Sequence, residues 1–285
     1  MEIKKVAVIG CGTMGRQIAM QVAISGYDVA CYSPIEEDIQ SAAEFSKNWF
    51  DERVGKGKLS EESANEIQKR LAFSVDLEAS AKGADLVIEA VVELLDVKRS
   101  VLKEVDALTP DHTILASNSS YIVSSKFADV AKHPDKVLNL HFFNPALVMK
   151  LVEIVQGPHV SDETIEIMEK FVKSIGKEPA IVKKEIYGFI VNRIFIAMID
   201  EACYLLDQGV AEIENIDRAV KFGLSHPMGP FELLDLTGID LQYDIQIERY
   251  RDTGDPVDKP SAALVERYAK GHYGRKTKKG FYDYE

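Results

Sequence analysis

The sequence has little cysteine, no long apolar run and no excess of basic residues. Its three cysteines (Cys11, Cys31 and Cys203) have neither the number nor the spacing of a disulfide framework or a zinc site. No stretch approaches the roughly 18 consecutive apolar residues of a transmembrane helix. The formal net charge is −12, which makes nucleic acid and anionic membranes unfavourable partners. These absences exclude a membrane-spanning protein and a disulfide-rich secreted module.

The remaining composition is that of an ordinary globular protein. Hydrophobic residues make up 46% and charged residues 28% of the 285 residues, so the chain can bury a full core. This length is typical of two domains or of one large one. Residues 1–5 lead straight into a strand-like run instead of a secretory signal. We therefore expect a folded protein of the reducing cytoplasm.

Short apolar segments alternate with helical patterns over the first two thirds of the chain. Strands are expected at residues 6–9, 27–33, 85–92, 113–116, 136–141, 151–155 and 179–182. Helices are expected at residues 16–25, over most of 35–70, at 97–108, between 116 and 136, and at 162–175. Apolar strands that alternate with helices are typical of a parallel sheet covered on both faces. Residues 1–184 are thus predicted to form a doubly wound α/β domain.

The pattern changes near Lys183, after which no convincing strand appears. Helical patterns occupy residues 188–207 and begin again near residues 213, 231, 240 and 261. Residues 185–285 are therefore predicted to form a smaller all-α domain.

A glycine turn, Gly10-x-Gly12-x-x-Gly15, joins the first predicted strand to the first helix. The first glycine permits the tight turn, the second lets the backbone approach a pyrophosphate, and the third lets helix and strand pack closely. The backbone amides of Thr13 and Met14, at the start of the helix, are then expected to face the phosphates. Because the motif follows a strand and opens a helix, it predicts a Rossmann-type dinucleotide site.

The nature of the dinucleotide depends on the end of the second strand, about 20 residues further on, where an acidic residue usually contacts the ribose. Ser33 occupies that place. Serine can bond a ribose hydroxyl and does not repel a 2′-phosphate. However, no lysine or arginine lies between residues 27 and 46, and residues 36–38 are acidic. We therefore predict NAD as the cofactor, with NADP as the alternative.

Several further segments are more specific than the glycine turn. They are SNSS at residues 117–120, HFFNP at 141–145, MKLVE at 149–153, GFIVNR at 188–193, HPMGPFELLD at 226–235, and GRKT and GFY at 274–282. With the glycine turn, these segments resemble the L-3-hydroxyacyl-CoA dehydrogenases over essentially the whole chain, and within them the stand-alone bacterial 3-hydroxybutyryl-CoA dehydrogenases. The resemblance implies reversible hydride transfer between NAD(P) and a short-chain (S)-3-hydroxyacyl-CoA, in fatty-acid or butyrate metabolism. It also implies a homodimer whose C-terminal domain mediates dimerisation and borders the substrate cleft.

Two residues fit this chemistry on their own. Oxidation of a secondary alcohol needs a base for the hydroxyl proton, and imidazole, with a pKa of about 6.5, exchanges protons near neutral pH. His141 ends a strand, at the sheet edge where α/β proteins bind ligands. Glu153, in a neighbouring strand-like segment, could bond the other ring nitrogen. The resemblance assigns His141 and Glu153 as the catalytic dyad.

The resemblance also implies roles for other positions. Ser120 and Asn192 match the residues that orient the substrate oxygen. The positions expected along the cofactor are Glu93, Lys98, Asn118 and Asn144, with Lys98 supplying positive charge. Lys56 and Lys58 are the candidates for the CoA phosphates. No histidine and carboxylate spacing indicates a metal site.

Simpler interpretations remain open for some of these residues. Glu153 could be an ordinary buried carboxylate, Ser120 a helix cap, Asn192 a structural amide, and Lys56 with Lys58 a solvated loop. The chain also departs from the family pattern at Ser33, Leu94, Tyr121 and Tyr187. Two other functions stay as alternatives: a dehydrogenase of a free hydroxy acid such as L-gulonate, and a non-catalytic, crystallin-like binding protein.

Overall fold

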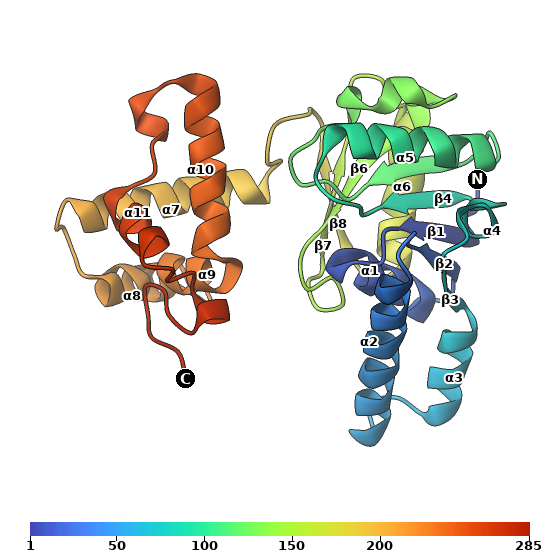
Figure 1. The fold of residues 1–285 in the computed structure, drawn as a ribbon, viewed down its shortest axis with the longest axis horizontal. Coiled ribbons are helices and arrows are strands. Elements are labelled where there is room, and N and C mark those ends of the chain that lie inside the picture. The colour runs from blue at the N-terminus through green and yellow to red at the C-terminus, as the bar shows by residue number, and fades with distance from the viewer. The chain divides into compact units, whose positions relative to one another are not determined.

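The computed structural model describes the backbone of residues 1–285 and every side chain except those of Glu248, Asp252, Thr253 and Val257. The chain divides into two compact units, which are Met1–Ile190 and Val191–Glu285 (Figure 1).

The N-terminal unit is built on one eight-stranded sheet with the order β3-β2-β1-β4-β5-β6-β7-β8. Its strands are β1 (Lys5–Ile9), β2 (Asp28–Tyr32), β3 (Leu71–Ser74), β4 (Leu86–Glu89), β5 (Ile114–Ser117), β6 (Val137–Phe142), β7 (Leu151–Val155) and β8 (Glu178–Val182). All neighbours are parallel except β6 and β7, which are antiparallel. The predicted α/β class, with a doubly wound, mostly parallel sheet, is confirmed.

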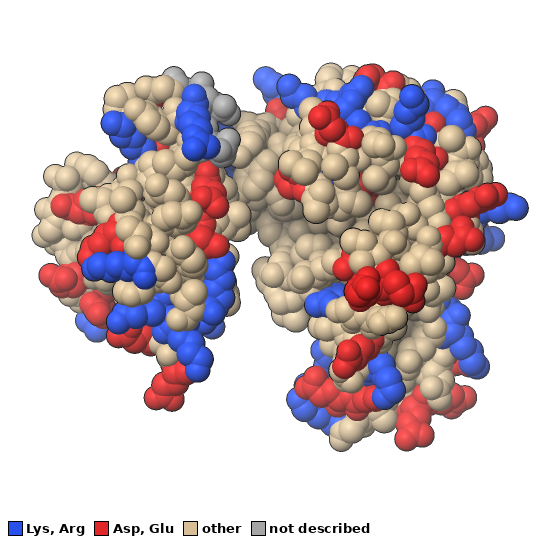
Figure 2. Space-filling view, in the orientation of Figure 1, with Lys and Arg blue, Asp and Glu red and all other residues tan. Residues whose placement is uncertain are grey.

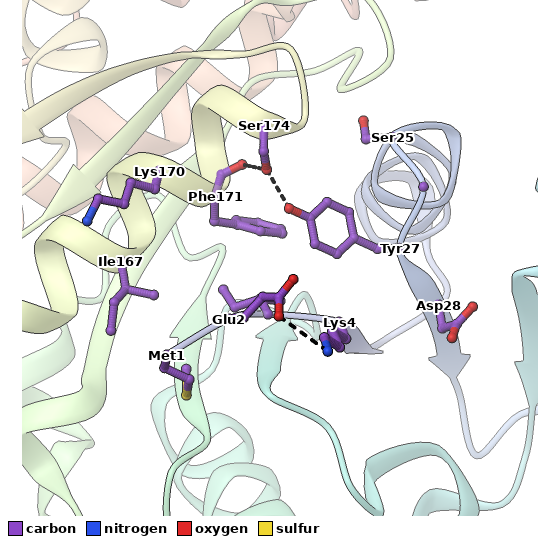
Figure 3. A pocket seen from close by; sticks show the side chains of 12 residues that line it. Met1, Glu2, Lys4, Ser25, Tyr27, Asp28, Ile167, Lys170, Phe171 and Ser174 are labelled. Carbon is purple, nitrogen blue, oxygen red and sulfur yellow. Dashed lines mark hydrogen bonds and ion pairs between the residues drawn. The ribbon is translucent and has the colours of Figure 1, made fainter.

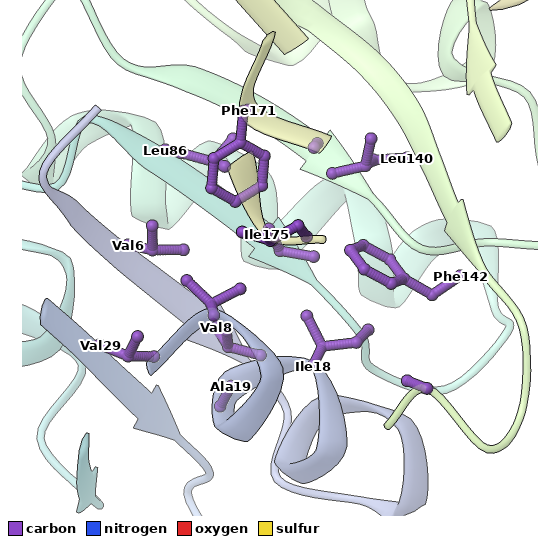
Figure 4. Close-up of a cluster of buried hydrophobic side chains, with 14 of the residues drawn as sticks. Val6, Val8, Ile18, Ala19, Val29, Leu86, Leu140, Phe142, Phe171 and Ile175 are labelled. Atoms are coloured by element: carbon purple, nitrogen blue, oxygen red, sulfur yellow. The ribbon is translucent and has the colours of Figure 1, made fainter. Parts of the chain in front are cut away.

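Helices cover both faces of this sheet (Figure 1). They are α1 (Thr13–Ile24), α2 (Glu36–Gly55), α3 (Glu61–Lys69), α4 (Leu77–Ala81), α5 (Leu95–Leu108) and α6 (Asp162–Ser174). Successive strand side chains point to opposite faces, so each strand contributes side chains to a hydrophobic core on either face of the sheet. On one face Val8 packs with Ile18 of α1 and Phe171 of α6 (Figure 4). On the other face Ile9 packs with Leu102 of α5.

The helix predicted between residues 116 and 136 is wrong. Three short 3-10 turns occupy that segment: η1 (Ser124–Lys126), η2 (Ala128–Val130) and η3 (Pro134–Lys136). Polar side chains here bond the backbone and compete with a helix. The Ile122 amide donates to Ser119 Oγ at 2.8 Å, and the Ser124 amide donates to Asn139 Oδ1 at 2.8 Å. Strand β3 and helix α4 were not predicted, because both are short and β3 is only partly buried.

The C-terminal unit is helical, as predicted. Its helices are α7 (Val191–Asp207), α8 (Ile213–Gly223), α9 (Pro230–Thr237), α10 (Ile239–Thr253) and α11 (Ala262–Ala269), with the 3-10 turns η4 (Pro256–Asp258) and η5 (Arg275–Thr277). Apart from isolated bridges at Gly274, Lys279 and Asp283, the part of this unit that the structure describes forms no strand. No helix among the described residues combines the length and the apolar character needed to cross a membrane.

Two buried aspartates hold the C-terminal segment onto this helical unit. Asp217 accepts hydrogen bonds from the Phe231 amide at 2.8 Å and from the Tyr282 hydroxyl at 2.8 Å. Asp235 accepts from the amides of Phe281 and Tyr282, each at 2.9 Å. Burial raises the pKa of Asp217, although these donors oppose the rise. The segments at residues 226–235 and 274–282 therefore contribute to the fold of this unit.

The helical pair α2 and α3 carries interspersed charges of both signs on the face seen in Figure 2. Lys56 pairs with Glu52 one turn earlier, and Lys47 pairs with Asp51 at 2.5 Å. Exposed pairs of this kind contribute little to stability, because water and salt screen their charges.

The glycine turn offers a direct test of the packing. A Cβ on Gly15 would lie 1.7 Å from the Gly10 carbonyl oxygen, whereas a Cβ on Gly12 would meet nothing within 4 Å. Gly15→Ala should therefore lower the free energy of unfolding by about 1–3 kcal/mol through overpacking. Gly12→Ala, the matched control, should change it by less than about 0.5 kcal/mol, because the weaker cap is offset by a less flexible unfolded chain. Urea denaturation measures both, and equal losses would contradict this packing.

Candidate active site

The structure brings His141 and Glu153 together across two antiparallel strands. His141 of β6 and Glu153 of β7 are directly opposite in the strand register. Opposite residues of an antiparallel pair point to the same face of the sheet. His141 Nδ1 lies 2.9 Å from Glu153 Oε2, with the two residues 4% and 0% exposed. The reversal of chain direction between β6 and β7 thus places a carboxylate beside the imidazole.

The other atoms of this pair are also held. The second carboxylate oxygen of Glu153 accepts a hydrogen bond from the Ile190 amide at 3.0 Å. The ring of His141 packs against Phe143 and Phe189, with centroids 4.5 Å and 5.5 Å away. His141 Nε2 lies 3.1 Å from Ser120 Oγ. The imidazole is therefore fixed in orientation, and its Nε2 atom faces the hydroxyl of Ser120.

The loop after β5 carries Ser120 and is tied to the neighbouring strands. Asn118 donates its backbone amide to the Glu89 carbonyl at 2.7 Å. Its side-chain Oδ1 accepts from the Phe142 amide at 2.9 Å. Asn118 thus joins the carboxyl ends of β4 and β6, and its side-chain oxygen is committed to that role. Ser120 does not cap an α-helix, since none follows it.

A buried charge network lies beneath this loop. Lys98 is 1% exposed, and its Nζ lies 2.9 Å from Glu89 Oε1 and 3.1 Å from Glu93 Oε2. Glu89 also accepts from Ser117 Oγ at 2.5 Å and from the Val91 amide at 2.7 Å. The ammonium of Lys98 is therefore shared by two carboxylates. Glu89 was not predicted as a site residue, although a carboxylate within an apolar strand is a signal for a buried pair.

Glu93 connects the loop after β4 with the loop after β5. It accepts from the Ser119 hydroxyl and from the Tyr121 amide, the latter at 3.2 Å. Burial by itself would raise the pKa of Glu93, but the charge of Lys98 and the hydroxyl of Ser119 outweigh it and lower the pKa. Glu93 is therefore ionised at neutral pH, and its side chain is 39% exposed. A partly exposed carboxylate remains at the carboxyl edge of the sheet.

The glycine turn fits the phosphates of a dinucleotide. Gly10 has φ +108°, and a Cβ there would lie 2.6 Å from the Ala90 carbonyl oxygen, so the loops after β1 and β4 are in close contact. Gly12 is the N-cap of α1, and no side chain caps that end. Open space surrounds the Cβ position of Gly12. The amides of Thr13 and Met14 open the helix, where an anion is favourable.

Ser33 lies at the end of β2 but is not available as a free hydroxyl. It is 3% exposed and donates to Asp38 Oδ2 at 2.8 Å, while its oxygen accepts from the Ile35 amide at 3.3 Å. Asp38 belongs to the first turn of α2 and is half-buried. The carboxylate of Asp38 therefore lies beside Ser33, which occupies the place of the usual ribose-binding acidic residue.

The remaining predicted residues belong to several different elements. Asn144 is exposed in the turn after β6. Asn192 is the second residue of α7 and belongs to the C-terminal unit. Lys56 and Lys58 are exposed at the end of α2, where Lys56 pairs with Glu52. Within the described side chains, no group of histidine, cysteine and carboxylates could hold a metal ion.

Two cavities lie in the N-terminal unit at different places. One, of about 500 Å³, is lined by residues such as Lys4, Tyr27 and Phe171, at the amino ends of β1 and β2 (Figure 3). Parallel sheets bind ligands at the other, carboxyl edge, so this cavity is not assigned to the site. The second, of about 480 Å³, is lined by Tyr121 and Tyr187, whose ring centroids are 4.7 Å apart. Burial raises the pKa of Tyr121 to about 12.

Comparisons with known proteins agree over the whole chain. A family model described as 3-hydroxyacyl-CoA dehydrogenase, NAD binding domain matches residues 5–186, and one described as 3-hydroxyacyl-CoA dehydrogenase, C-terminal domain matches residues 188–284. The chain is 40% identical to a 3-hydroxybutyryl-CoA dehydrogenase of Clostridioides difficile over 98% of this chain and 99% of that one. It is 38% identical to a probable 3-hydroxybutyryl-CoA dehydrogenase of Bacillus subtilis over 100% and 99%. The crystal structure of (S)-3-hydroxybutyryl-CoA dehydrogenase from Ralstonia eutropha has a TM-score of 0.92 at 36% identity and full coverage of both chains.

The charge network can be tested through stability. Lys98→Met removes the cation and leaves buried Glu89 uncompensated, which should lower the free energy of unfolding by about 3–5 kcal/mol. Lys103→Met is the matched control, because Lys103 is exposed on the same helix and should change it by less than about 0.5 kcal/mol. The double variant Lys98→Met with Glu89→Gln should recover part of the loss. A Lys98→Met protein as stable as Lys103→Met would contradict the network.

Proposed function

We propose, because the chain belongs to the 3-hydroxyacyl-CoA dehydrogenase family, that it interconverts a short-chain (S)-3-hydroxyacyl-CoA and the corresponding 3-oxoacyl-CoA with NAD. The observation that carries this proposal is the line Glu153–His141–Ser120, with contacts of 2.9 Å and 3.1 Å at the carboxyl edge of the sheet. Relatives named for a CoA ester favour this substrate class over a free hydroxy acid. An intact dyad favours an enzyme over a binding protein.

His141 and Glu153 carry out the proton transfer of the proposed reaction. During oxidation His141 Nε2 accepts the proton of the substrate hydroxyl, and in the reverse direction it returns that proton. Glu153 accepts the hydrogen bond from Nδ1, which fixes the tautomer and stabilises the imidazolium that forms. Ser120 Oγ, beside Nε2, donates to the substrate oxygen and orients it. The glycine turn would hold NAD, whose nicotinamide would supply the hydride acceptor for the carbinol carbon.

The cofactor is proposed to lie over the glycine turn and the carboxyl ends of β1, β4 and β5. The amides after Gly12 bind its pyrophosphate, since that helix end is uncapped and open. Asp38, held by Ser33, contacts the ribose and disfavours a 2′-phosphate. Glu93 and Asn144 face the cofactor. Lys98 acts by holding Glu93, because its own charge is already shared by two carboxylates.

The substrate contacts proposed here come from the family resemblance and from the lining of the second cavity. Ser120 and Asn192 both donate to the substrate oxygen, as the family resemblance implies. Lys56 and Lys58 supply cations for the CoA phosphates. Tyr121, which lines the second cavity together with Tyr187, is the residue directly after Ser120. Two aromatic rings in that cavity leave room for a short acyl chain.

The assembly and location proposed are a homodimer in the cytoplasm. The C-terminal unit exposes large apolar side chains, including Phe222 at 80%, Ile194 at 66% and Val210 at 65%. Large apolar and aromatic side chains are the residue types that protein interfaces bury at their centre. All three cysteines are free thiols, which fits a reducing compartment. The helical domain predicted at residues 185–285, whose compact unit is Val191–Glu285, is the proposed dimerisation domain.

The dyad predicts a specific kinetic result. His141→Ala should leave the affinity for NADH within a few fold, because no cofactor contact is removed. It should lower the turnover of acetoacetyl-CoA by at least about 100-fold, the usual scale of general acid–base catalysis. His112→Ala is the matched control, since His112 is half exposed and bonds Asp85 at 2.9 Å. Near-normal turnover in His141→Ala, or faster reduction of free acetoacetate than of acetoacetyl-CoA by the wild type, would overturn the proposal.

The ribose contact predicts a change of cofactor preference. Asp38→Asn removes the negative charge that repels a 2′-phosphate, so the ratio of kcat/KM with NADPH to that with NADH should rise about 5-fold or more. Glu37→Gln is the matched control, because Glu37 is exposed in the same turn of α2 and should leave the ratio unchanged. Both ratios come from initial rates with acetoacetyl-CoA. A similar response of the two variants would place the ribose elsewhere.

A further inference from the structure

Two cysteine sulfurs meet inside the first βαβ segment of the N-terminal unit. Cys11 Sγ and Cys31 Sγ lie 2.9 Å apart, and both residues are buried, at 3% and 0% exposure. Both are free thiols. A disulfide bond has an S–S distance of about 2.05 Å, so the sulfurs need to approach by less than about 1 Å. Neither thiol takes part in the reaction proposed above.

The position of the pair links it to the glycine turn. Cys11 stands between Gly10 and Gly12 and directly precedes the start of α1. Cys31 lies in β2, opposite Val8 in the parallel register of β1 and β2. The residues that follow Cys11, Gly12 and Thr13, are exposed. A small movement of the loop therefore gives a small oxidant access to the Cys11 sulfur.

We propose that Cys11 and Cys31 form a redox modification site, at which a peroxide converts the two thiols into a disulfide. Hydrogen peroxide first oxidises the Cys11 thiol to a sulfenic acid and is reduced to water. The Cys31 thiol then attacks that sulfur, the S–S bond forms, and the hydroxyl leaves as a second water. Two thiols and one peroxide thus give one disulfide and two waters. A thiol reductant reverses the change.

The roles of the two thiols follow from their surroundings. Burial raises the pKa of Cys31 well above its usual value, so Cys31 has little thiolate and is the less reactive of the two toward peroxide. Cys11 lies in the loop and reacts first. A peroxide is small enough to reach a thiol that a bulky disulfide reagent would not reach.

The disulfide would alter the turn that is proposed to hold the dinucleotide. The turn has little spare room, because the Cβ position of Gly10 lies 2.6 Å from the Ala90 oxygen and that of Gly15 lies 1.7 Å from the Gly10 oxygen. Drawing Cys11 toward β2 therefore displaces the amides that follow it. Binding of NADH and oxidation of the pair should oppose each other. This second effect rests on the proposed cofactor site, whereas disulfide formation does not.

The experiment treats the full-length protein with hydrogen peroxide and counts thiols after denaturation. Wild-type protein should fall from three free thiols to one, and peptide mass spectrometry should find Cys11 linked to Cys31. Cys203→Ala is the matched control, because Cys203 is an equally buried thiol of the C-terminal unit. That variant should still form the linked peptide. Cys11→Ala and Cys31→Ala should not, and dithiothreitol should restore all three thiols of the wild type.

The outcomes separate the two halves of the proposal. Three free thiols in the native protein, under conditions in which peroxide oxidises the denatured chain, would overturn it. A disulfide that links Cys11 to Cys203 instead of Cys31 would overturn it too. Over-oxidation of Cys11 without linkage would overturn it as well. Saturating NADH should slow the linkage several fold, and the oxidised protein should bind NADH several fold more weakly by fluorescence titration. If NADH did not change the rate of linkage, the disulfide would still be supported, but the cofactor would have to bind away from this turn.

Discussion

The hydrogen bond between His141 Nδ1 and Glu153 Oε2 exists because the sheet reverses direction between β6 and β7. In a continuous parallel sheet, residues twelve apart could not be opposite each other, since a parallel crossover needs a longer connection. The antiparallel pair also places Glu153 deep in the sheet, where the Ile190 amide bonds its other oxygen. A buried carboxylate is costly without partners, and these two donors compensate it. The orientation of the imidazole, and with it the position of Ser120, follows from this pairing.

The loops around the dyad depend on a second set of buried charges. Lys98, Glu89 and Glu93 connect helix α5 to the ends of β4 and β5, so removing one charge would leave the others uncompensated. Such a network fixes loop geometry more than it adds stability. The glycine turn contributes by close contact instead, because its backbone meets Ala90 with no side chain between. Dyad, charge network and turn all lie along the carboxyl edge of one sheet, where a dinucleotide and a carbinol carbon could meet.

Sequence patterns correctly predicted those helices and strands that depend on the local order of residues along the chain. Helix α1 and strand β7 agree closely with expectation, because apolar periodicity and a glycine turn mark them. The helix expected after residue 116 does not form, since Ser119 and Asn139 bond the backbone there, and no periodicity reveals such bonds. Side-chain contacts that depend on tertiary packing could not be predicted either. The contacts of Ser33 with Asp38 and of Cys11 with Cys31 depend on how β2, α2 and the loop pack, which composition and spacing do not determine.

Glu153 holds His141 in the tautomer whose Nε2 carries no proton and can accept the substrate proton. Nitrogen-15 NMR of histidine-labelled holoenzyme measures this directly, with the His141 signals assigned by their loss in His141→Gln. We expect a ring protonated at Nδ1 and unprotonated at Nε2 in the wild type, and a mixture of tautomers in Glu153→Ala. A wild-type ring protonated at Nε2, or a tautomer that does not respond to the loss of Glu153, would contradict it.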